Sequence, residues 1–278
     1  MNRLKDFSRL TVCFTIPIAV LMAVCSGLGI WDRSLYAKET ADWLSQCVGQ
    51  DFSNLLCVIP TLLVSAFLAA KGSRGAKIIW VGAMITNIYS YIIYCFSVHF
   101  NYLFHLYCLI LGLSVYAVIC FAIQDRGSDY SRWFSGSVKR MPAAVLLIAI
   151  AVLFSLLWLS QTVPAALQNS LPQSIVKDAV PTNPIYVLDF SFYIPLLFIS
   201  SILLIRNAGA GYFLAPMMLV FGIITNVNII SLTGVTAVYT HSNQAPMLIL
   251  FSIFTVVCFI FLLPLLKGIK KAGRSEKS

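Results

Sequence analysis

The sequence predicts an all-α, polytopic transmembrane helix bundle of about eight spans, with both termini in the cytoplasm. Of its 278 residues, 59% are hydrophobic and only 10% are charged, and its mean hydropathy is +0.88. Soluble domains average about 25% charged residues, so this chain has too little polar surface to face water all round. Its apolar runs are about 20 residues long, the length of a spanning helix, whereas membrane-barrel strands alternate over about 10 residues. We therefore expect helices in lipid, where every backbone group must be paired internally.

The chain is expected to form a single transmembrane domain over residues 1–278. The polar segment 125–142, rich in Gly, Ser and Arg, separates two halves of four spans, and the halves show no clear internal repeat. The connection 99–101 is so short that the third and fourth spans must be antiparallel neighbours. Residues 38–48 are compatible with a short surface helix. The eight predicted spans cover residues 10–31, 54–70, 78–98, 102–124, 143–163, 185–205, 212–238 and 247–266.

The first apolar run, residues 10–31, follows a basic segment and therefore resembles a signal peptide. Its apolar part is longer than a usual signal-peptide core, and no A-x-A cleavage site closes it. The segment from Met22 to Cys25 resembles a lipoprotein cleavage site only loosely, because Val24 is not small. We therefore expect an uncleaved first span.

The basic residues predict the orientation of the bundle. Three of the 19 Lys and Arg residues, Arg33, Lys38 and Lys177, lie in the connections after the first, third, fifth and seventh spans. The other sixteen lie in the two tails and in the connections after the second, fourth and sixth spans. Because basic residues favour the cytoplasmic side of a membrane, this bias predicts that both termini are cytoplasmic.

The net charge of +9 does not indicate nucleic-acid binding. The basic residues are spread over short connections, and the sequence contains no soluble domain that could hold a polynucleotide. The expected partner is the lipid bilayer, with a small molecule or a lipid as the candidate ligand. The oligomeric state is left open.

The eight cysteines do not predict a metal site. None forms a C-x-x-C pair, and most lie inside apolar runs, where Cys behaves as a small hydrophobic residue. Cys47 and Cys57 lie ten residues apart, and this separation alone neither establishes nor excludes a disulfide between them. The sequence contains no H-E-x-x-H, G-x-S-x-G or P-loop motif. We expect no metal ion and no cofactor, and whether the protein is an enzyme is left open.

The hairpin of residues 87–107 carries more hydrogen-bonding side chains than any other apolar stretch of this length. On the third span, polar and aromatic residues recur every three or four positions from Asn87 to Tyr94 and therefore share one helix face. Asn101 and His105 begin a similar face on the fourth span, so the two faces can meet. Tyr also forms aromatic belts and Asn also joins spans, so a packing role and a ligand-binding role both stay open.

Asp189 is the one acidic residue inside a predicted span. It lies about 5 Å, or one helical turn, from the outer end of the sixth span. A carboxylate inside a span is costly and usually faces the bundle interior or a water-filled cavity, which makes it a functional candidate. Gln50 and Asp51 precede the second span at the same level. Each aspartate has an alternative role as a helix cap.

These residues predict an outward-facing polar cluster between the second, third, fourth and sixth spans. A second polar set lies in the seventh span with Pro216 and Gly234, which can mark a broken helix at a transport site but are also common in ordinary spans. The candidate ligand-binding residues are Gln50, Asp51, Asn87, Tyr91, Tyr94, Asn101, His105 and Asp189.

Three motifs carry a resemblance to a known group of proteins. They are Gly49-Gln50-Asp51 before Pro60, then Tyr91-x-x-Tyr94-x-Phe96-x-Val98-x-Phe100-Asn101-x-x-Phe104-x-x-Tyr107, then Asn183-Pro184-x-x-x-Leu188-Asp189 before Pro195. Over residues 45–220 the chain resembles uncharacterised bacterial multi-pass inner-membrane proteins of about eight helices. The resemblance implies a bacterial inner-membrane location and brings no activity, and His105 is not part of its pattern.

The leading functional hypothesis is a small-solute transporter or ligand-binding sensor with an outward-facing pocket, in which Asp189 pairs with a cation or a proton. The second is a membrane-embedded enzyme acting on a lipid or quinone, with Asp189 and His105 as an acid–base pair. The third is an accessory subunit whose polar faces bind another membrane protein.

Overall fold

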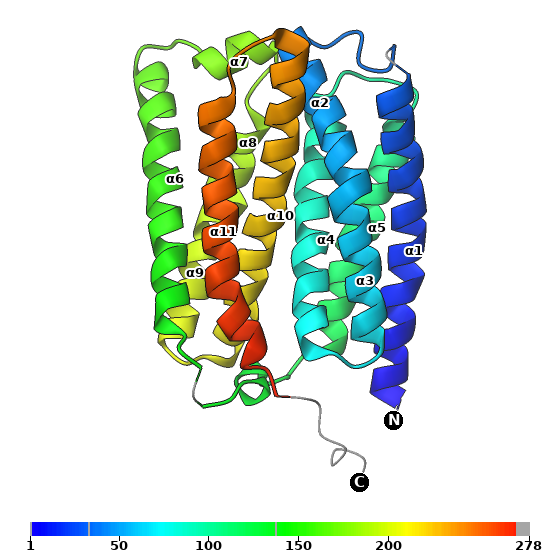
Figure 1. Ribbon diagram of the computed structural model, residues 1–278, viewed down its shortest axis with the longest axis vertical. Coiled ribbons are helices and arrows are strands. Elements are labelled where there is room, and N and C mark those ends of the chain that lie inside the picture. Colours follow the sequence, from blue (N-terminus) through cyan, green and yellow to red (C-terminus); the bar gives the residue numbers. More distant parts are fainter. Residues whose placement is uncertain (1, 33, 137, 271–278) are drawn as a thin grey trace.

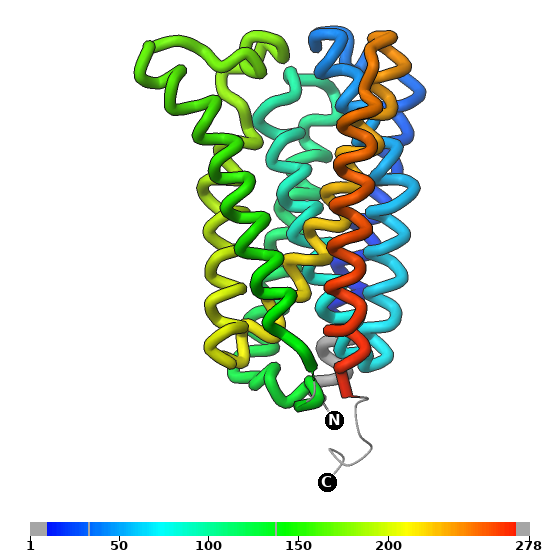
Figure 2. Tube along the Cα trace, turned by 60° about the vertical axis from the view of Figure 1, so that its left-hand side comes forward, coloured from blue at the N-terminus to red at the C-terminus, as the bar shows by residue number. Residues whose placement is uncertain are grey.

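The computed structural model describes residues 2–32, 34–136 and 138–270. Over these ranges the chain is an all-α bundle without a strand, and eight helical spans are long and apolar enough to cross a membrane. The predicted fold class and number of spans are therefore confirmed. The first helix begins and the last helix ends at the same end of the bundle, which we call the termini end, and the opposite end is the loop end (Figures 1 and 2).

Four spans lie on each side of a polar connection. The first half consists of α1 (Asn2–Trp31), α2 (Ala41–Ser53), the π-helix η1 (Asn54–Val58), α3 (Ile59–Ala70), α4 (Arg74–Ser97) and α5 (Phe104–Gln124). The connection contains the short 3₁₀-helix η2 (Tyr130–Trp133). The second half consists of α6 (Met141–Leu167), the short α7 (Gln173–Asp178), α8 (Pro184–Leu188), the π-helix η3 (Asp189–Tyr193), α9 (Ile194–Ile205), α10 (Gly209–Thr240) and α11 (Ala245–Lys267).

The second span differs most from its predicted limits. The prediction started this span at residue 54 and assigned 38–48 to a surface helix, whereas α2 begins at Ala41 and continues through η1 into α3 as one span. Thr40 is the N-cap, because its side chain accepts a hydrogen bond from a backbone N–H of the first turn. Asp51 therefore lies inside the helix and does not cap it. The limits of the other spans agree with the prediction to within about four residues, although the helix α1 itself begins eight residues before its predicted span.

A ladder of small and polar residues joins α2 to α10, which lies at the centre of the bundle beside α4 (Figure 1). Gly49 allows this approach, because a Cβ added there would lie 2.5 Å from the Leu232 Cα. α10 continues unbroken past Pro216, so the polar set of the seventh span does not mark a broken helix. Three hydrogen bonds join the two helices: Ser45 Oγ to Thr236 Oγ1 at 2.7 Å, Ser231 Oγ to the Gly49 carbonyl at 2.7 Å, and Ser53 Oγ to Asn228 Oδ1 at 2.6 Å.

Candidate functional site

Asp51 is the centre of a buried hydrogen-bond network near the loop end of α2. Its side chain is enclosed by α1, α4, α5 and the loop after α1, and the residue is only 1% exposed. The hydroxyl of Tyr36 donates to Oδ2 and that of Tyr94 donates to Oδ1, both at 2.8 Å. Gly29 of α1 leaves the space that the carboxylate occupies, because a Cβ there would lie 2.0 Å from Oδ2. Burial raises the pKa of Tyr36 well above its ordinary value, so this hydroxyl keeps the proton that it donates.

Three tyrosine rings pack beside this carboxylate. The rings of Tyr91, Tyr94 and Tyr107 lie with centroids 5.0–6.2 Å apart, which joins α4 to α5. The Tyr107 hydroxyl is buried and has no hydrogen-bond partner among the described residues. An unpartnered buried hydroxyl is costly, so this position can accept a further donor or a water molecule.

Asp189 forms a second network on the other side of α4. It is the first residue of the π-helix η3 and is 4% exposed. Tyr89 of α4 donates its hydroxyl hydrogen to Oδ1 at 3.0 Å, and the indole N–H of Trp158 in α6 donates to Oδ2 at 2.7 Å. Asp189 thus lies within a span and faces the bundle interior, which is one of the two positions left open by the sequence, and it does not cap a helix.

Both carboxylates are held by neutral donors. Neither forms a salt bridge in the described part of the chain, and each accepts two hydrogen bonds from aromatic side chains. A buried carboxylate without a cation loses the solvation energy of its charge and recovers only part of it from such bonds. The arrangement is therefore suited to a group that changes its protonation or binds a partner during function.

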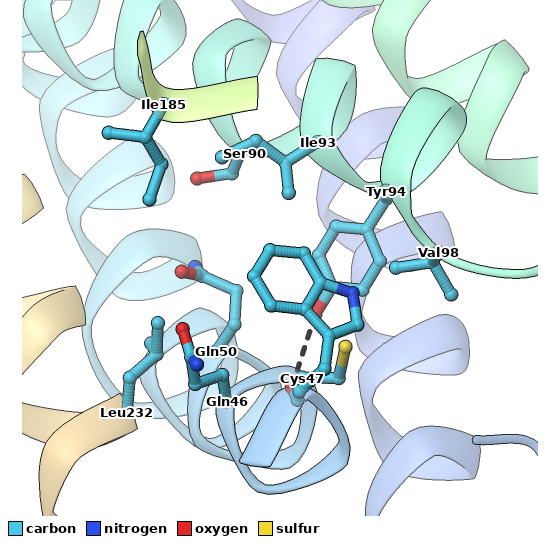
Figure 3. Close-up of a pocket in the computed structure, with 10 residues that line it drawn as sticks. Gln46, Cys47, Gln50, Ser90, Ile93, Tyr94, Val98, Ile185 and Leu232 are labelled. Atoms are coloured by element: carbon cyan, nitrogen blue, oxygen red, sulfur yellow. Dashed lines mark hydrogen bonds between the residues drawn. The ribbon is translucent and has the colours of Figure 1, made fainter. Parts of the chain in front are cut away.

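A small cavity lies between the two networks (Figure 3). Its volume is about 60 Å³, and its walls come from α2, α4, α8 and α10. A water molecule needs about 10–15 Å³ of such space, so the cavity can hold about four waters or a small solute. The walls are mainly apolar, with a few polar groups. The lining residues are Trp43, Gln46, Cys47, Gln50, Ser90, Ile93, Tyr94, Val98, Ile185 and Leu232.

Two of the predicted site residues line this cavity, and two others, Tyr91 and Asp189, lie near it without lining it. Gln50 lines the cavity and donates from its amide to Asn54 Oδ1 at 2.9 Å, and Tyr94 lines it while donating to Asp51. Tyr91 packs behind Tyr94. Asp189 lies one turn beyond the lining residue Ile185. The cavity thus involves the second, third and sixth spans as predicted, but the seventh span replaces the fourth.

Three other predicted residues lie apart from the cavity. Asn87 joins α4 to α5 by donating its amide N–H to Ser114 Oγ at 2.9 Å. Asn101 stabilises the hairpin turn, because its Oδ1 accepts from the Leu103 N–H at 3.0 Å. His105 is exposed on the outer surface of the bundle. The structure therefore does not place His105 beside the buried Asp189, and the acid–base pair of the enzyme hypothesis is not formed.

Of the four residues that hold the two carboxylates, the sequence predicted Tyr94 and missed the other three. Tyr36 lies in a loop, Trp158 in an otherwise plain apolar span, and Tyr89 beside the polar face of the third span. Each looks like an ordinary interfacial aromatic, so no sequence signal separates it from an aromatic belt. All eight cysteines are free, so Cys47 and Cys57 do not form a disulfide. No cluster of His, Cys, Asp and Glu among the described residues could hold a metal ion.

An acidic pair at the loop end predicts a pH effect on stability. Burial and the nearby Asp42 carboxylate raise the pKa of Asp178 in α7 to about 6 from 3.8, although Lys177, which binds Asp42 Oδ1 at 2.8 Å, opposes this. Because the pKa of Asp178 is higher in the folded state, its protonation adds to the free energy of unfolding. This contribution is fully present below pH 3.8 and is lost as the pH rises through about 6. The melting temperature of the wild type should therefore be higher at pH 5 than at pH 7.

The matched variant is Asp178→Asn, which is uncharged at every pH. We expect its melting temperature to exceed that of the wild type at pH 7 and to equal it near pH 5. Equal pH dependence of the two proteins would contradict this assignment.

Comparisons with known proteins give no match: no protein-family model, no curated protein and no solved structure matches the chain.

Proposed function

We propose that this protein is a small-solute transporter or ligand-binding sensor of the bacterial inner membrane. In this proposal both termini are cytoplasmic and the loop end faces outwards, as the distribution of Lys and Arg predicts. The solute binds from the loop end in the cavity between α2, α4, α8 and α10.

The observation that carries the proposal is the cavity between two salt-bridge-free carboxylate networks. Small-molecule sites are typically concave and mainly apolar, with a few well-placed polar groups that orient the ligand. Gln46, Gln50 and Ser90 are such groups in this cavity, and Figure 3 shows them around the same space as Ile185 and Leu232. Ionisable residues inside a span support a functional site by default, because they are otherwise costly.

The cavity favours a small and uncharged or zwitterionic solute. No Lys, Arg, Asp or Glu is among its lining residues, so it offers no direct partner for a net charge. The amides of Gln46 and Gln50 and the hydroxyl of Ser90 can both donate and accept hydrogen bonds. Amino acids, small amides and polyols have the matching groups.

Trp43 allows the proposal to be tested directly, because it lines the cavity. The purified protein is titrated with a panel of amino acids, small amides and polyols while tryptophan fluorescence is recorded. We expect one of these classes to change the fluorescence, and we expect the change to vanish in Trp43→Phe. Uptake of the active solute into proteoliposomes then separates a transporter from a sensor.

A filling variant shows whether binding occurs in this cavity. Leu232→Phe places a larger side chain in it and should weaken binding at least about tenfold, which corresponds to about 1.4 kcal/mol. Leu153→Phe is the matched control, because Leu153 is exposed on the outer surface of α6. The proposal fails if no panel member gives a Trp43-dependent signal, or if Leu232→Phe binds as the wild type does.

A further inference from the structure

The same short motif occurs at the same place in both halves of the chain. Residues 51–53 read Asp-Phe-Ser and precede an Ile-Pro pair at 59–60, and residues 189–191 read Asp-Phe-Ser and precede an Ile-Pro pair at 194–195. In each half a five-residue π-helix ends directly before the Ile-Pro pair. Each pair begins a helix of 12 residues, α3 or α9.

The structural correspondence continues beyond the motif. α3 ends at a basic residue, Lys71, and α9 ends at Arg206. The next residue has a positive φ in both halves, 93° at Gly72 and 59° at Asn207. Two residues later a long helix begins, α4 in the first half and α10 in the second. The two segments therefore share element lengths, the position of the π-helix and the geometry of the turn.

The packing of consecutive spans follows the same plan in both halves, although α1 also packs closely on α5 whereas α6 contacts α11 only slightly. α1 packs on α3, α3 on α4 and α4 on α5, and correspondingly α6 packs on α9, α9 on α10 and α10 on α11. α4 and α10 contact each other at the centre, with the remaining helices of their own halves on either side (Figures 1 and 2). Because each half has four spans, both halves cross the membrane in the same direction.

The halves differ in a way that affects the carboxylates. Five residues separate Asp51-Phe52-Ser53 from its Ile-Pro pair, but two separate the second motif from its pair. Asp51 is thus about one helical turn, or about 5 Å, farther from the Ile-Pro pair than Asp189. The two carboxyl groups thus differ in their offset from the Ile-Pro pair, and the walls of the cavity come from both halves.

We infer that the chain consists of two copies of a four-span unit, and that Asp51 and Asp189 are the proton-binding carboxyl groups of the two copies. π-Helical turns inside longer helices frequently occur at functional sites, and the sites of secondary transporters with internal repeats lie at the repeat interface. Proton coupling to solute movement rests on the proposed function, whereas proton binding itself does not depend on the solute.

The hydrogen-bond donors favour a proton over a metal cation. The indole N–H of Trp158 can only donate, so the Asp189 oxygen that it binds faces a positive hydrogen rather than space for an ion. Hard cations require several oxygen ligands with free lone pairs. A proton requires only one acceptor, and tyrosine hydroxyls can accept as well as donate.

Beside Asp51, the Cys47 carbonyl is a second acceptor for the hydroxyl hydrogen of Tyr94. The Tyr94 hydroxyl lies 2.8 Å from Asp51 Oδ1 and 3.4 Å from the Cys47 carbonyl. When a proton from the loop end binds the carboxylate, the new O–H can donate to the Tyr94 oxygen, and Tyr94 can donate to the carbonyl instead. On release, the proton leaves the carboxyl group and Tyr94 returns to Oδ1. No other bond forms or breaks.

The titratable groups around both carboxylates are neutral tyrosines and thiols. Asp51 faces Tyr36 from the loop, Cys25 of α1, Cys47 of its own helix, Tyr91 and Tyr94 of α4, and Tyr107 of α5. Asp189 faces Tyr89 of α4 and Tyr193 of η3, with Cys258 of α11 beyond that ring. Tyrosines and thiols have no carboxyl band in the infrared, so the Asn variants can identify the bands of Asp51 and Asp189 among those of the other carboxyl groups.

The test is infrared difference spectroscopy of the full chain in lipid between acidic and alkaline pH. We expect the carbonyl band of protonated carboxyl groups to lose one component in Asp51→Asn, another in Asp189→Asn and both in the double variant. Asp178→Asn is the control for a carboxyl group at the loop end and should remove neither component. Tyr94→Phe and Trp158→Phe should shift the respective bands while keeping both carboxyl groups, which guards against misfolding of the Asn variants.

The inference is overturned if the double Asn variant, folded as judged by circular dichroism, retains the carboxyl bands of the wild type. It is also overturned if only one of the two aspartates contributes, because the copies are then not equivalent. A fluorescence change at Trp43 without these carboxyl bands would support the proposed function and contradict proton binding. The carboxyl bands without a fluorescence change would support proton binding and contradict the proposed function.

Discussion

Gly49→Ala should destabilise the protein by about 3–5 kcal/mol, although it adds a single methyl group. The new Cβ would lie 2.5 Å from the Leu232 Cα and 2.9 Å from its backbone nitrogen. Backbone atoms inside a helix cannot rotate away, so α2 and α10 must separate. Separation weakens the three hydrogen bonds of the ladder, which contribute about 0.6 kcal/mol each in a membrane bundle, and adds an overpacking cost of about 1–3 kcal/mol.

Unfolding in mixed detergent micelles, with an increasing fraction of sodium dodecyl sulfate, measures this loss. Gly234→Ala is the matched control on the same pair of helices, because no atom lies within 4 Å of its added Cβ. We expect that variant to be as stable as the wild type or slightly more stable, since Ala is the better helix former. Similar stability of both variants would show that α2 and α10 are not in close contact.

Asp51→Leu should cost about 2–6 kcal/mol, because it leaves the buried hydroxyls of Tyr36 and Tyr94 without their acceptor. A buried donor that loses its partner costs about 1–3 kcal/mol, and Leu offers no replacement. Asp51→Asn retains one carbonyl oxygen and should therefore be milder. The same micelle titration ranks the three proteins.

Removing the donors as well should recover most of this stability. In the triple variant Asp51→Leu/Tyr36→Phe/Tyr94→Phe, both tyrosine donors are removed together with their acceptor, and Ser26 keeps its hydrogen bond from Asn54. An apolar replacement of a buried polar group can be nearly neutral. Recovery would show that the network is retained for function rather than for stability. If Asp51→Leu alone is as stable as the wild type, the carboxylate is not the acceptor of both hydroxyls.

The membrane class was predictable from the sequence because lipid imposes one dominant condition on every span. Each run must be apolar, helical and about 20 residues long, so composition and length alone determine the number of spans. The carboxylate of Asp189 was also predictable as an interior group, because exposure to lipid is too costly. Both results follow from the free energy of transfer of single residues and require no knowledge of neighbours.

The second span shows where this reasoning fails. The predicted second span started at residue 54, with Gln50 and Asp51 before it. The helix begins at Ala41, because Asp51 is paired by hydroxyls from a loop and from α4. Polar partners that lie far away in the sequence offset the transfer cost, and a local pattern cannot reveal them.

The repeat of the Asp-Phe-Ser and Ile-Pro motifs was only partly predictable from the sequence. Both copies are visible in the sequence, but the spacing differs by three residues, and only the shared π-helices and turns align them. The polar face of the third span is similar. Its contact with the fourth span through Asn87 and Tyr94 was expected, whereas the exposure of His105 was not.

The sequence by itself determined that this is a helical membrane bundle, how many spans it has and which polar residues are unusual within them. The tertiary structure decided which helices meet, which donors hold each aspartate and where the cavity lies. The physical reason is that water and lipid act on each residue separately. Helix pairing in lipid instead depends on close approach at residues such as Gly49 and on hydrogen bonds between distant segments.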